Sequence, residues 1–229
     1  MKAIGLIGGM SWESTITYYQ LINETVKNIL GGFHSSKIYM YSVDFAELEE
    51  NMHSGNWDAN ATILSKAAKK LEEAGADFIV IATNTMHKMV PEIEKHINIP
   101  IFHIADATAE AIKKDGLKKI ALLGTEFTMT QDFIKERLTK AGLEVIVPCQ
   151  EDIKIIDDII FKELCLGDVL DSSRIKYQNI IEKMKNEGAE GVILGCTEIG
   201  MLISQNDSVL PVYDTTIIHA TEAAKMQCI

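Results

Sequence analysis

The sequence predicts an α/β fold of two similar halves, each built around a parallel sheet. Short apolar segments alternate with longer segments of helical periodicity along the 229 residues. This alternation is typical of parallel sheets that are covered by helices. Runs such as FIVIA, which starts at Phe78, contain no polar side chain, as expected of strands buried on both faces. A repeat between the halves is the third observation.

Three segments of the first half recur in the same order in the second half. KAIGLIGG near the start of the chain resembles KKIALLGT from Lys118, GADFIVIATNT from Gly75 resembles GAEGVILGCTE from Gly188, and IPIF resembles LPVY. Apolar strands often look alike, but that does not explain three matched pairs in one order. We therefore expect two pseudo-symmetric domains, in which Thr83 and Cys196 occupy equivalent positions.

Each half is expected to hold about four strands, joined by helices. The strands are expected over 2–7, 37–43, 77–82 and 100–102, and over 118–123, 143–147, 192–194 and 211–213. Helices are expected over 12–30, 58–74, 128–141, 173–187 and 215–226, and all but the last stop directly before a glycine. The first domain is expected over 1–103 plus 214–229, because the last helix returns to it, and the second over 104–213.

Composition and charge exclude several classes of protein. A hydrophobic share of 47% and a charged share of 24% are typical of a globular chain. A formal net charge of −11, with no run of basic residues, argues against a nucleic-acid partner. No apolar stretch approaches the roughly 20 residues of a membrane span. The four cysteines form no CxxC pair and the histidines lack metal-ligand spacing. We therefore expect a cytoplasmic protein with no membrane partner, no disulfide and no metal site.

Polar motifs follow three of the predicted strands at their carboxyl ends. Ligands bind at this edge in open parallel sheets. Small polar residues there leave backbone N–H groups and hydroxyls available to hold an anion such as a carboxylate. The motif residues are Met10 after the first strand, Thr83, Asn84 and Thr85 after a central strand, and Cys196, Thr197 and Glu198 after its counterpart. If the halves face each other, Thr83 and Cys196 approach opposite sides of one ligand.

Cys196 is the candidate for chemistry among the cysteines. A cysteine is most often a small buried hydrophobic residue, and the other three are interpreted in that way. Cys196 differs because it follows a glycine at a strand end and precedes two hydrogen-bonding residues and a predicted helix start. A helix N-terminus lowers the pKa of a thiol, so we expect a reactive thiolate. His87 and His219 either orient polar groups near this edge or are ordinary surface histidines.

Together these segments resemble the aspartate/glutamate racemase superfamily, and most closely its aspartate racemase branch. The resemblance covers essentially the whole chain and rests on IGLIGGMSWEST, TNTMH, HIADAT, LGCTEIG and LPVYDTTIIHA. The GCTE motif favours this branch over the glutamate racemases of cell-wall synthesis, which carry GCTH. The resemblance implies two pseudo-symmetric α/β domains with the active site between them, in a homodimer.

The resemblance also implies an isomerase, an amino-acid racemase that uses no pyridoxal phosphate, other cofactor or metal. In the family one cysteine thiolate removes the α-proton and a second cysteine returns a proton to the opposite face, which is general acid–base catalysis. This chain has Thr83 where the family motif CNT has its cysteine. A threonine hydroxyl can donate a proton but is a very poor base. We therefore expect Cys196 as base, Thr83 as donor, and a bias toward one enantiomer, by analogy the L form.

The expected substrate is aspartate or glutamate. Asn84, Thr85 and Thr197 match family positions that hold the α-carboxylate, Met10 matches a loop that lines the site, and Glu198 completes the expected binding set. The substrate's second carboxylate needs a cation or several hydrogen-bond donors, and the resemblance implies an arginine or a lysine. The candidates are Lys154 and Lys162, although each also fits a solvated helix face.

Two other functions stay open. One is another enzyme of the superfamily, a decarboxylase or a cis–trans isomerase, because single-cysteine members decarboxylate. The other is a degenerate protein that binds an amino acid or a dicarboxylate without turning it over, because one cysteine is missing.

Overall fold

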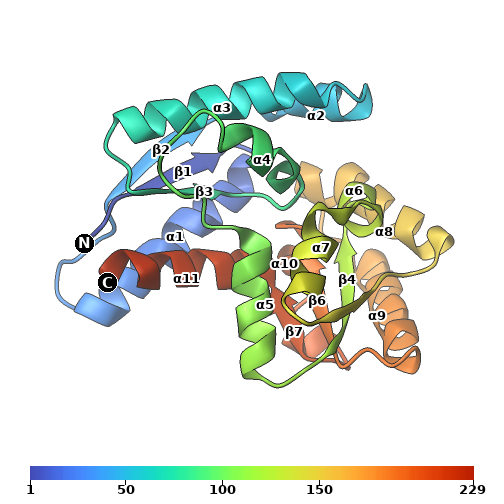
Figure 1. The fold of residues 1–229 in the computed structure, drawn as a ribbon. Coiled ribbons are helices and arrows are strands. Elements are labelled where there is room, and N and C mark those ends of the chain that lie inside the picture. Colours follow the sequence, from blue (N-terminus) through green and yellow to red (C-terminus); the bar gives the residue numbers. More distant parts are fainter. The chain divides into compact units, whose positions relative to one another are not determined.

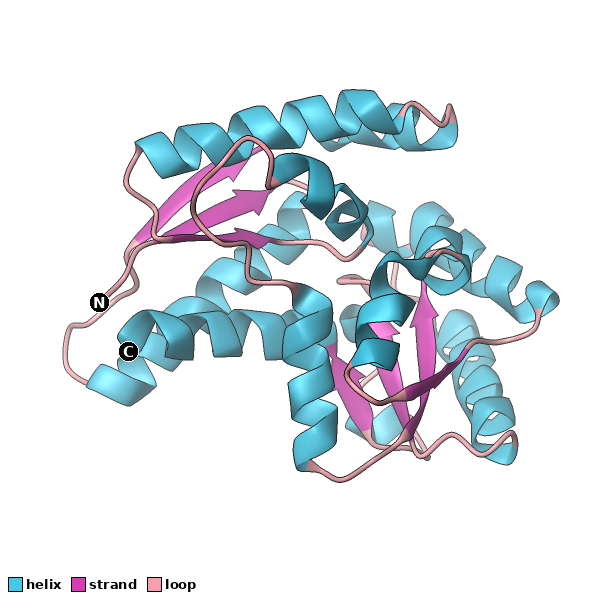
Figure 2. Ribbon diagram, in the orientation of Figure 1, coloured by secondary structure: helices cyan, strands magenta, loops and turns pink.

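The computed structural model describes all 229 residues and divides them into two compact units. Unit 1 comprises Met1–Ile104 and His219–Ile229, and unit 2 comprises Ala105–Ile218. Each unit carries helices around its own parallel sheet (Figure 1 and Figure 2), so the predicted fold class is confirmed. The units divide after Ile104 and Ile218, whereas the expected boundaries are after residues 103 and 213.

The sheet of unit 1 has three parallel strands in the order β2–β1–β3. They are β1 (Ile4–Gly8), β2 (Ile38–Ser42) and β3 (Phe78–Ile81). The helical elements of this unit are α1 (Trp12–Leu30), α2 (Phe45–His53), α3 (Trp57–Glu73), η1 (Thr85–Met89), α4 (Val90–Ile93) and most of α11 (Thr215–Cys228). None of the helices in the chain combines the length and apolar character that crossing a membrane requires.

The expected strand over 100–102 is wrong as a full strand. Only Ile101 pairs, in an isolated parallel bridge with Ile79. The bridge consists of hydrogen bonds from Ile79 N–H to Pro100 O (2.9 Å) and from Phe102 N–H to Ile79 O (2.8 Å). Pro100 has no N–H to extend the ladder, and the chain enters α5 (Ile104–Lys114) directly afterwards, so the pairing stops.

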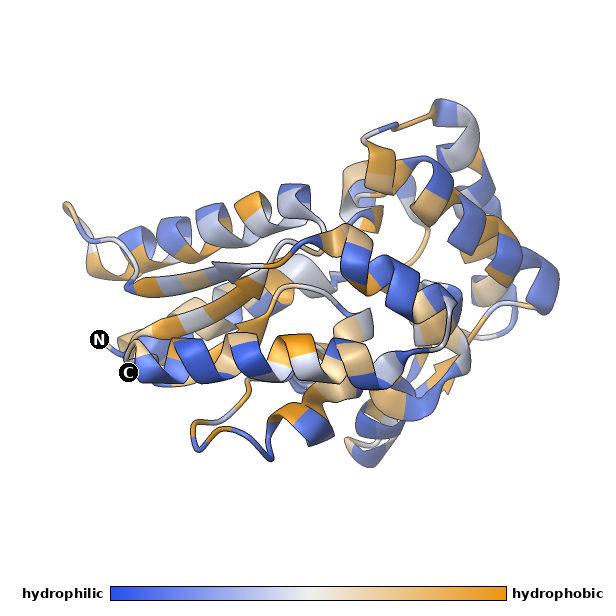
Figure 3. Ribbon diagram, turned by 90° about the horizontal axis from the view of Figure 1, so that it is seen from above, coloured by the Kyte–Doolittle hydropathy of each residue, from blue (hydrophilic) through white to orange (hydrophobic).

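Alternate residues of β1 and β3 face two helical layers. One face packs on α1 and α11 in a single buried cluster, whose strand residues are Ile4, Leu6, Phe78, Val80 and Ala82. The other face meets α3, where a Cβ on Gly5 would lie only 3.1 Å from Leu71 Cβ of that helix, and less than 3 Å from Ile79 and Ala76. The close approach of α3 to the sheet therefore depends on a glycine at this position. Figure 3 shows the apolar residues gathered along these strands.

Helix α11 is tied to the strand starts of unit 1 by one buried side chain. Gln227 Nε2 donates to Lys2 O (2.6 Å) and to Lys37 O (2.8 Å), and the Lys2 N–H donates to Gln227 O (3.0 Å). Ala220, Ala223 and Ala224 complete the cluster beneath β1 and β3. The last helix thus packs into the core of the first unit, as the sequence predicted.

The sheet of unit 2 has four parallel strands in the order β5–β4–β6–β7. They are β4 (Lys119–Gly124), β5 (Glu144–Ile146), β6 (Gly191–Gly195) and β7 (Val212–Asp214). Its further helical elements are α6 (Glu126–Thr130), α7 (Asp132–Lys140), α8 (Gln150–Lys162), η2 (Leu164–Leu166), α9 (Asp171–Asn186), α10 (Ile199–Leu202) and η3 (Gln205–Asp207). The helix expected over 128–141 is two helices, because Gln131 is extended.

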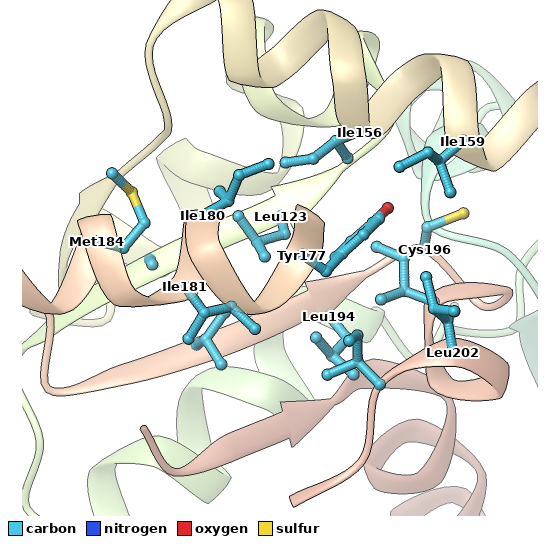
Figure 4. Packing of buried hydrophobic residues seen from close by; sticks show 14 of the residues in the cluster. Leu123, Ile156, Ile159, Tyr177, Ile180, Ile181, Met184, Leu194, Cys196 and Leu202 are labelled. Atoms are coloured by element: carbon cyan, nitrogen blue, oxygen red, sulfur yellow. The ribbon is translucent and has the colours of Figure 1, made fainter. Parts of the chain in front are cut away.

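The buried cluster of unit 2 lies between its sheet and two long helices. Isoleucines of α8 and α9 pack with Leu123 of β4 and Leu194 of β6, as Figure 4 shows. The same cluster includes Tyr177 and Cys196, so the candidate catalytic cysteine is part of a close-packed apolar environment.

The repeat predicted from the sequence has a counterpart in the hydrogen bonds. The backbone of Asp77 donates to Ala3 O, and that of Glu190 donates to Lys119 O, both over 2.8 Å. The carboxylates at the same two positions accept in return: Asp77 Oδ2 from Ala3 N–H (2.6 Å) and Glu190 Oε2 from Lys119 N–H (3.0 Å). Equivalent acidic residues thus start β3 and β6 in the two units.

The glycines before these strands are equivalent as well. Gly75 has φ +100° and Gly188 has φ +92°, a region that only glycine adopts without strain. Each follows a long helix and turns the chain into the next strand, β3 or β6. β6 is an inner strand of its sheet, whereas β3, expected as a central strand, stands last in the order β2–β1–β3. The matched GAD and GAE segments therefore encode one helix-to-strand turn used twice.

Candidate active site

The loop after β1 is fixed by threonine and serine side chains. Ser11 caps α1 by accepting from Ser14 N–H. Thr15 Oγ1 accepts from Gly9 N–H (2.8 Å) and donates to Ser11 O (2.7 Å). Met10, the expected lining residue, lies in this loop and is buried. The start of α1 at its capping serine therefore fixes the conformation of the loop at the carboxyl edge of the sheet.

The TNT motif lies at the same edge of unit 1. β1 and β3 are neighbours and pair Ile7 with Ile81, so the segments that follow both strands emerge side by side. Thr83 is half-buried, and Asn84 and Thr85 are buried. The structure therefore brings Met10 and the three motif residues to one edge of one sheet.

His87 fixes the main chain of Thr83. Its Nδ1 lies 2.7 Å from Thr83 O, and its Nε2 lies 3.2 Å from the backbone nitrogen of Ile104. A carbonyl oxygen only accepts and a backbone N–H only donates, so Nδ1 carries the proton and Nε2 has none. His87 is buried, which corrects its interpretation as a surface histidine and supports the orienting alternative.

His219 is also buried, behind the same motif. Its Nε2–H donates to Phe102 O (2.7 Å), and its Nδ1 accepts from the Tyr18 hydroxyl (3.0 Å). Burial lowers the pKa of His219 to about 4, so the ring is neutral near pH 7. The ring centroid of His87 lies 5.7 Å from that of His219 and 4.5 Å from that of His103. The rings of three histidines thus lie close together in the interior of unit 1, in tilted and edge-to-face arrangements.

Cys196 in unit 2 donates a hydrogen bond to a carboxylate. Its Sγ lies 3.0 Å from Glu198 Oε2, and Thr197 Oγ1 donates to the same oxygen over 2.7 Å. All three side chains are buried. A carboxylate two residues from a buried thiol can hold the thiol's proton or accept it, depending on its own protonation. The structure thus joins the three expected residues in one hydrogen-bonded group.

The expected low pKa of Cys196 is wrong. Burial, together with the negative charge of Glu198, raises the pKa of the Cys196 thiol well above its ordinary value. The predicted helix start contributes little, because α10 begins only at Ile199 and has four residues. The resting residue is therefore a thiol, and a proton acceptor is needed before it can act as a base.

Tyr177 lies in the same apolar cluster. Its hydroxyl is fully buried and has no hydrogen-bond partner. Burial is the main cause that raises the pKa of Tyr177, and the nearby Cys196 is the second, so the phenol stays protonated. Figure 4 shows its hydroxyl directed to the side of the cluster where Ile159 and Cys196 lie. The unpartnered hydroxyl is an exception among buried polar groups.

The two lysines expected to bind the substrate's second carboxylate are on exposed helix faces. Lys154 is exposed on α8, and Lys162 forms an ion pair of 2.7 Å with Asp158 near the end of the same helix. Another lysine lies next to the TNT motif: Lys88 of η1 belongs to the TNTMHK segment, with Nζ 3.6 Å from the ring centroid of Trp57. Its place three residues after Thr85 was a signal available in the sequence.

The fold and the two strand-end motifs define an α/β protein of two repeated units. A family model described as Asp/Glu/Hydantoin racemase matches residues 7–223, and the chain therefore belongs to that family. Membership of a racemase family supports an isomerase that acts on amino acids.

Individual relatives agree with this assignment. A candidate Asp/Glu racemase from Yersinia pestis is 51% identical, with a TM-score of 0.93 and 100% of both chains covered. An aspartate racemase homologue from Pyrococcus horikoshii OT3 is 38% identical, with a TM-score of 0.86 and the same coverage. The broad specificity amino-acid racemase RacX from Bacillus subtilis strain 168 is 23% identical over 218 residues, 93% of this chain and 92% of that protein.

Proposed function

We propose that the chain is an amino-acid racemase that acts on aspartate or glutamate without a cofactor. Cys196 is the base that removes the α-proton, and Thr83 is the donor on the opposite face. The observation that carries the proposal is the hydrogen bond from Cys196 Sγ to Glu198 Oε2, because it gives a buried thiol a proton acceptor. The equivalence of Thr83 and Cys196 in the repeat supports the second half of it.

The proton steps balance as follows. Glu198, as carboxylate, takes the thiol proton and leaves a Cys196 thiolate. The thiolate then takes the α-proton, the Cα–H bond breaks, and the electron pair stays on the planar carbanion. Thr83 gives its hydroxyl proton to the other face of Cα, and the alkoxide is reprotonated by water. Glu198 loses its proton to water, which restores the starting state.

The exchange of cysteine for threonine makes catalysis unequal in the two directions. A thiol is a much stronger acid than an alcohol, so Cys196 forms its anion far more readily than Thr83. Abstraction from the Cys196 face, which we assign to the L-enantiomer, is the fast direction. Asn84, Thr85 and Thr197 are proposed to hold the α-carboxylate and Met10 to line the site. Glu198, expected in the binding set, is proposed as the thiol's proton acceptor instead.

One observation favours a second candidate function. The raised pKa means that the Cys196 thiol keeps its proton, and a site that binds a ligand without removing its α-proton needs no thiolate. A degenerate binder of an amino acid or dicarboxylate is therefore the alternative. Another reaction of the superfamily, decarboxylation or cis–trans isomerisation, has no separate support in the structure.

The homodimer is proposed on the exposed face of α1. Trp12, Ile16 and Tyr19 stand three and four residues apart and are 63%, 55% and 51% exposed. Residues at this spacing share one helix face, and a second copy of the chain would cover these large apolar side chains. The cytoplasmic location stays a prediction from the cysteine pattern.

Incubation in D₂O tests the proposed function. Each enantiomer of aspartate and glutamate is followed by NMR for α-proton exchange and by chiral chromatography for inversion. Exchange with inversion supports the racemase, and binding without exchange supports the degenerate binder. Cys196→Ala should remove exchange, whereas Cys165→Ala, which alters another cysteine of unit 2, should keep it. Retained exchange in Cys196→Ala would contradict the proposal.

A further inference from the structure

Lys88 is a half-buried lysine with an aromatic partner. Its Nζ lies 3.6 Å from the ring centroid of Trp57, a distance at which the negative face of the ring attracts a cation. Trp57 is the first residue of α3 and Lys88 belongs to η1, so the contact joins segments that are far apart in sequence. The ring contacts one side of the ammonium, and the N–H groups on its other sides can still donate hydrogen bonds.

No carboxylate is paired with this ammonium. Burial alone lowers the pKa of Lys88, and no acidic side chain acts on it. Two lysines of unit 2 show the paired arrangement: Lys162 pairs with Asp158 and Lys183 with Asp152. A partly desolvated cation without a counter-ion is unfavourable unless another group compensates for it. The chain supplies Trp57 and no anion, which leaves a place for an anionic ligand.

The contact lies at the edge of unit 1 that carries the TNT motif. Helix α3 leads back to the start of β3, so its first residue, Trp57, stands at the carboxyl end of that strand. In a 3₁₀-helix, residues three apart lie one above the other, so Thr85 and Lys88 share a face of η1. The cation is thus one helical turn from a residue proposed to hold the substrate's α-carboxylate.

We propose that Lys88, held over Trp57, binds the side-chain carboxylate of an acidic amino-acid substrate. The inference rests on the proposed function and names the residue that selects an acidic substrate at the same site. It replaces Lys154 and Lys162 as the expected cation. A lysine ammonium is a compact charge that attracts either aspartate or glutamate, and it discriminates both from the neutral amides of the same shape.

Calorimetric binding and exchange kinetics with isosteric pairs test this inference. L-Aspartate is compared with L-asparagine, and L-glutamate with L-glutamine, in the wild type and in Lys88→Met. We expect the variant to bind aspartate at least tenfold more weakly, with a raised KM and a kcat within about threefold. Binding of asparagine should change little, so that the preference for the acid disappears. Lys88→Arg should restore part of it.

Lys70→Met is the matched control, because Lys70 also lies over an aromatic ring, that of Tyr41 at 5.2 Å, but is exposed. It should leave binding unchanged. Thermal unfolding confirms that each variant is folded. Unchanged preference for aspartate over asparagine in a folded Lys88→Met protein would overturn the inference. A wild type that binds aspartate without exchange would overturn the racemase proposal alone, because binding still reports on Lys88.

Discussion

Cys196 Sγ and Glu198 Oε2 lie 3.0 Å apart on the turn that follows β6. Both residues are buried, and Thr197 donates to the same carboxylate oxygen. A thiol whose pKa is raised by burial cannot act as a base at neutral pH on its own. In the proposed mechanism Glu198 takes the proton of the Cys196 thiol, and this role gives the first test.

Replacing Glu198 with Gln should lower α-proton exchange at pH 7 by about a hundredfold, the lower range for general-base catalysis. Glutamine keeps an acceptor oxygen but cannot take a proton. The deficit should shrink as pH rises, because the thiol then ionises without help and the Glu198 charge that raises its pKa is gone. Exchange rates from about pH 6 to about pH 10, upward in the direction of the raised thiol pKa, check this. An equal deficit at every pH contradicts it, and Glu182→Gln, which alters an exposed residue of α9, is the control.

Changes at Thr83 should alter the two directions separately. Thr83→Cys should raise exchange from the slow enantiomer by about tenfold or more, because a thiol can abstract as well as donate. Thr83→Val removes the hydroxyl at nearly constant volume and should stop inversion while exchange at the Cys196 face persists. Thr83→Ser should keep inversion. Time courses from both pure enantiomers measure these effects, and inversion by Thr83→Val would refute the donor role.

His219 should make the free energy of unfolding depend on pH. Its pKa is lowered from an ordinary value of 6.5 to about 4 in the folded protein, so the unfolded chain binds more protons between these values. Stability should therefore fall as pH drops from 6.5 toward 4, by about 3 kcal/mol in all at about 1.4 kcal/mol per pKa unit. Its contacts, the Tyr18 hydroxyl, the Phe102 carbonyl and the His87 ring, carry no fixed charge.

Urea unfolding at several pH values measures this dependence. His219→Gln should be less stable than the wild type at about pH 8, where the histidine is neutral in both states, but should show a shallower loss toward acid pH. His34→Gln, which alters an exposed histidine of the same unit, should keep the wild-type slope. Equal slopes in His219→Gln and the wild type would show that this histidine is not the source.

Tyr177→Phe should leave the free energy of unfolding unchanged or raise it by about 1 kcal/mol. The substitution keeps the ring and removes a buried hydroxyl that has no hydrogen-bond partner. A buried hydroxyl without a partner destabilises the folded state, because it has lost its hydrogen bonds to water. Tyr177→Leu should cost about 2 kcal/mol or more, because it leaves a cavity in the cluster. Denaturant unfolding compares the two. A loss above about 1 kcal/mol in Tyr177→Phe would mean that the hydroxyl has a bound partner such as water.

A charge on the exposed face of α1 should break a homodimer. Ile16→Arg places a cation at the centre of the stripe of Trp12, Ile16 and Tyr19. Light scattering should show a monomer for this variant and a dimer for the wild type. Ile175→Arg is matched in residue type and exposure, at 56% against 55%, and should remain dimeric. A monomeric wild type, or an unaffected Ile16→Arg dimer, contradicts the assignment.

The elements that sequence predicted well are those whose signals lie within a few residues. Gly75 and Gly188 were predicted correctly because a helix end with positive φ needs a glycine, which the sequence shows directly. The burial of FIVIA was predicted correctly because a strand with only apolar side chains is unfavourable in water. Residues 100–102 failed because pairing length depends on where the next helix starts. The helix over 128–141 failed because the break at Gln131 has no glycine or proline to mark it.

The site shows the same division. The order of the motif residues predicted their places after the strands, whereas their roles stay predictions. The pKa of Cys196 was predicted in the wrong direction, because chain neighbours do not show how deeply a sulfur is buried. The bond from His87 to Thr83 O and the contact between Lys88 and Trp57 depend on how η1 folds back. Distances of this kind require coordinates.

Early-time isotope analysis of L-aspartate turnover in D₂O tests the opposite-face mechanism most directly. If Cys196 removes the proton and Thr83 returns one from solvent, the D-aspartate formed first carries deuterium at Cα, while the remaining L-aspartate is still protiated. Protium in that first D-aspartate, or deuterium appearing equally in both enantiomers, would show that one group serves both faces and would contradict the mechanism.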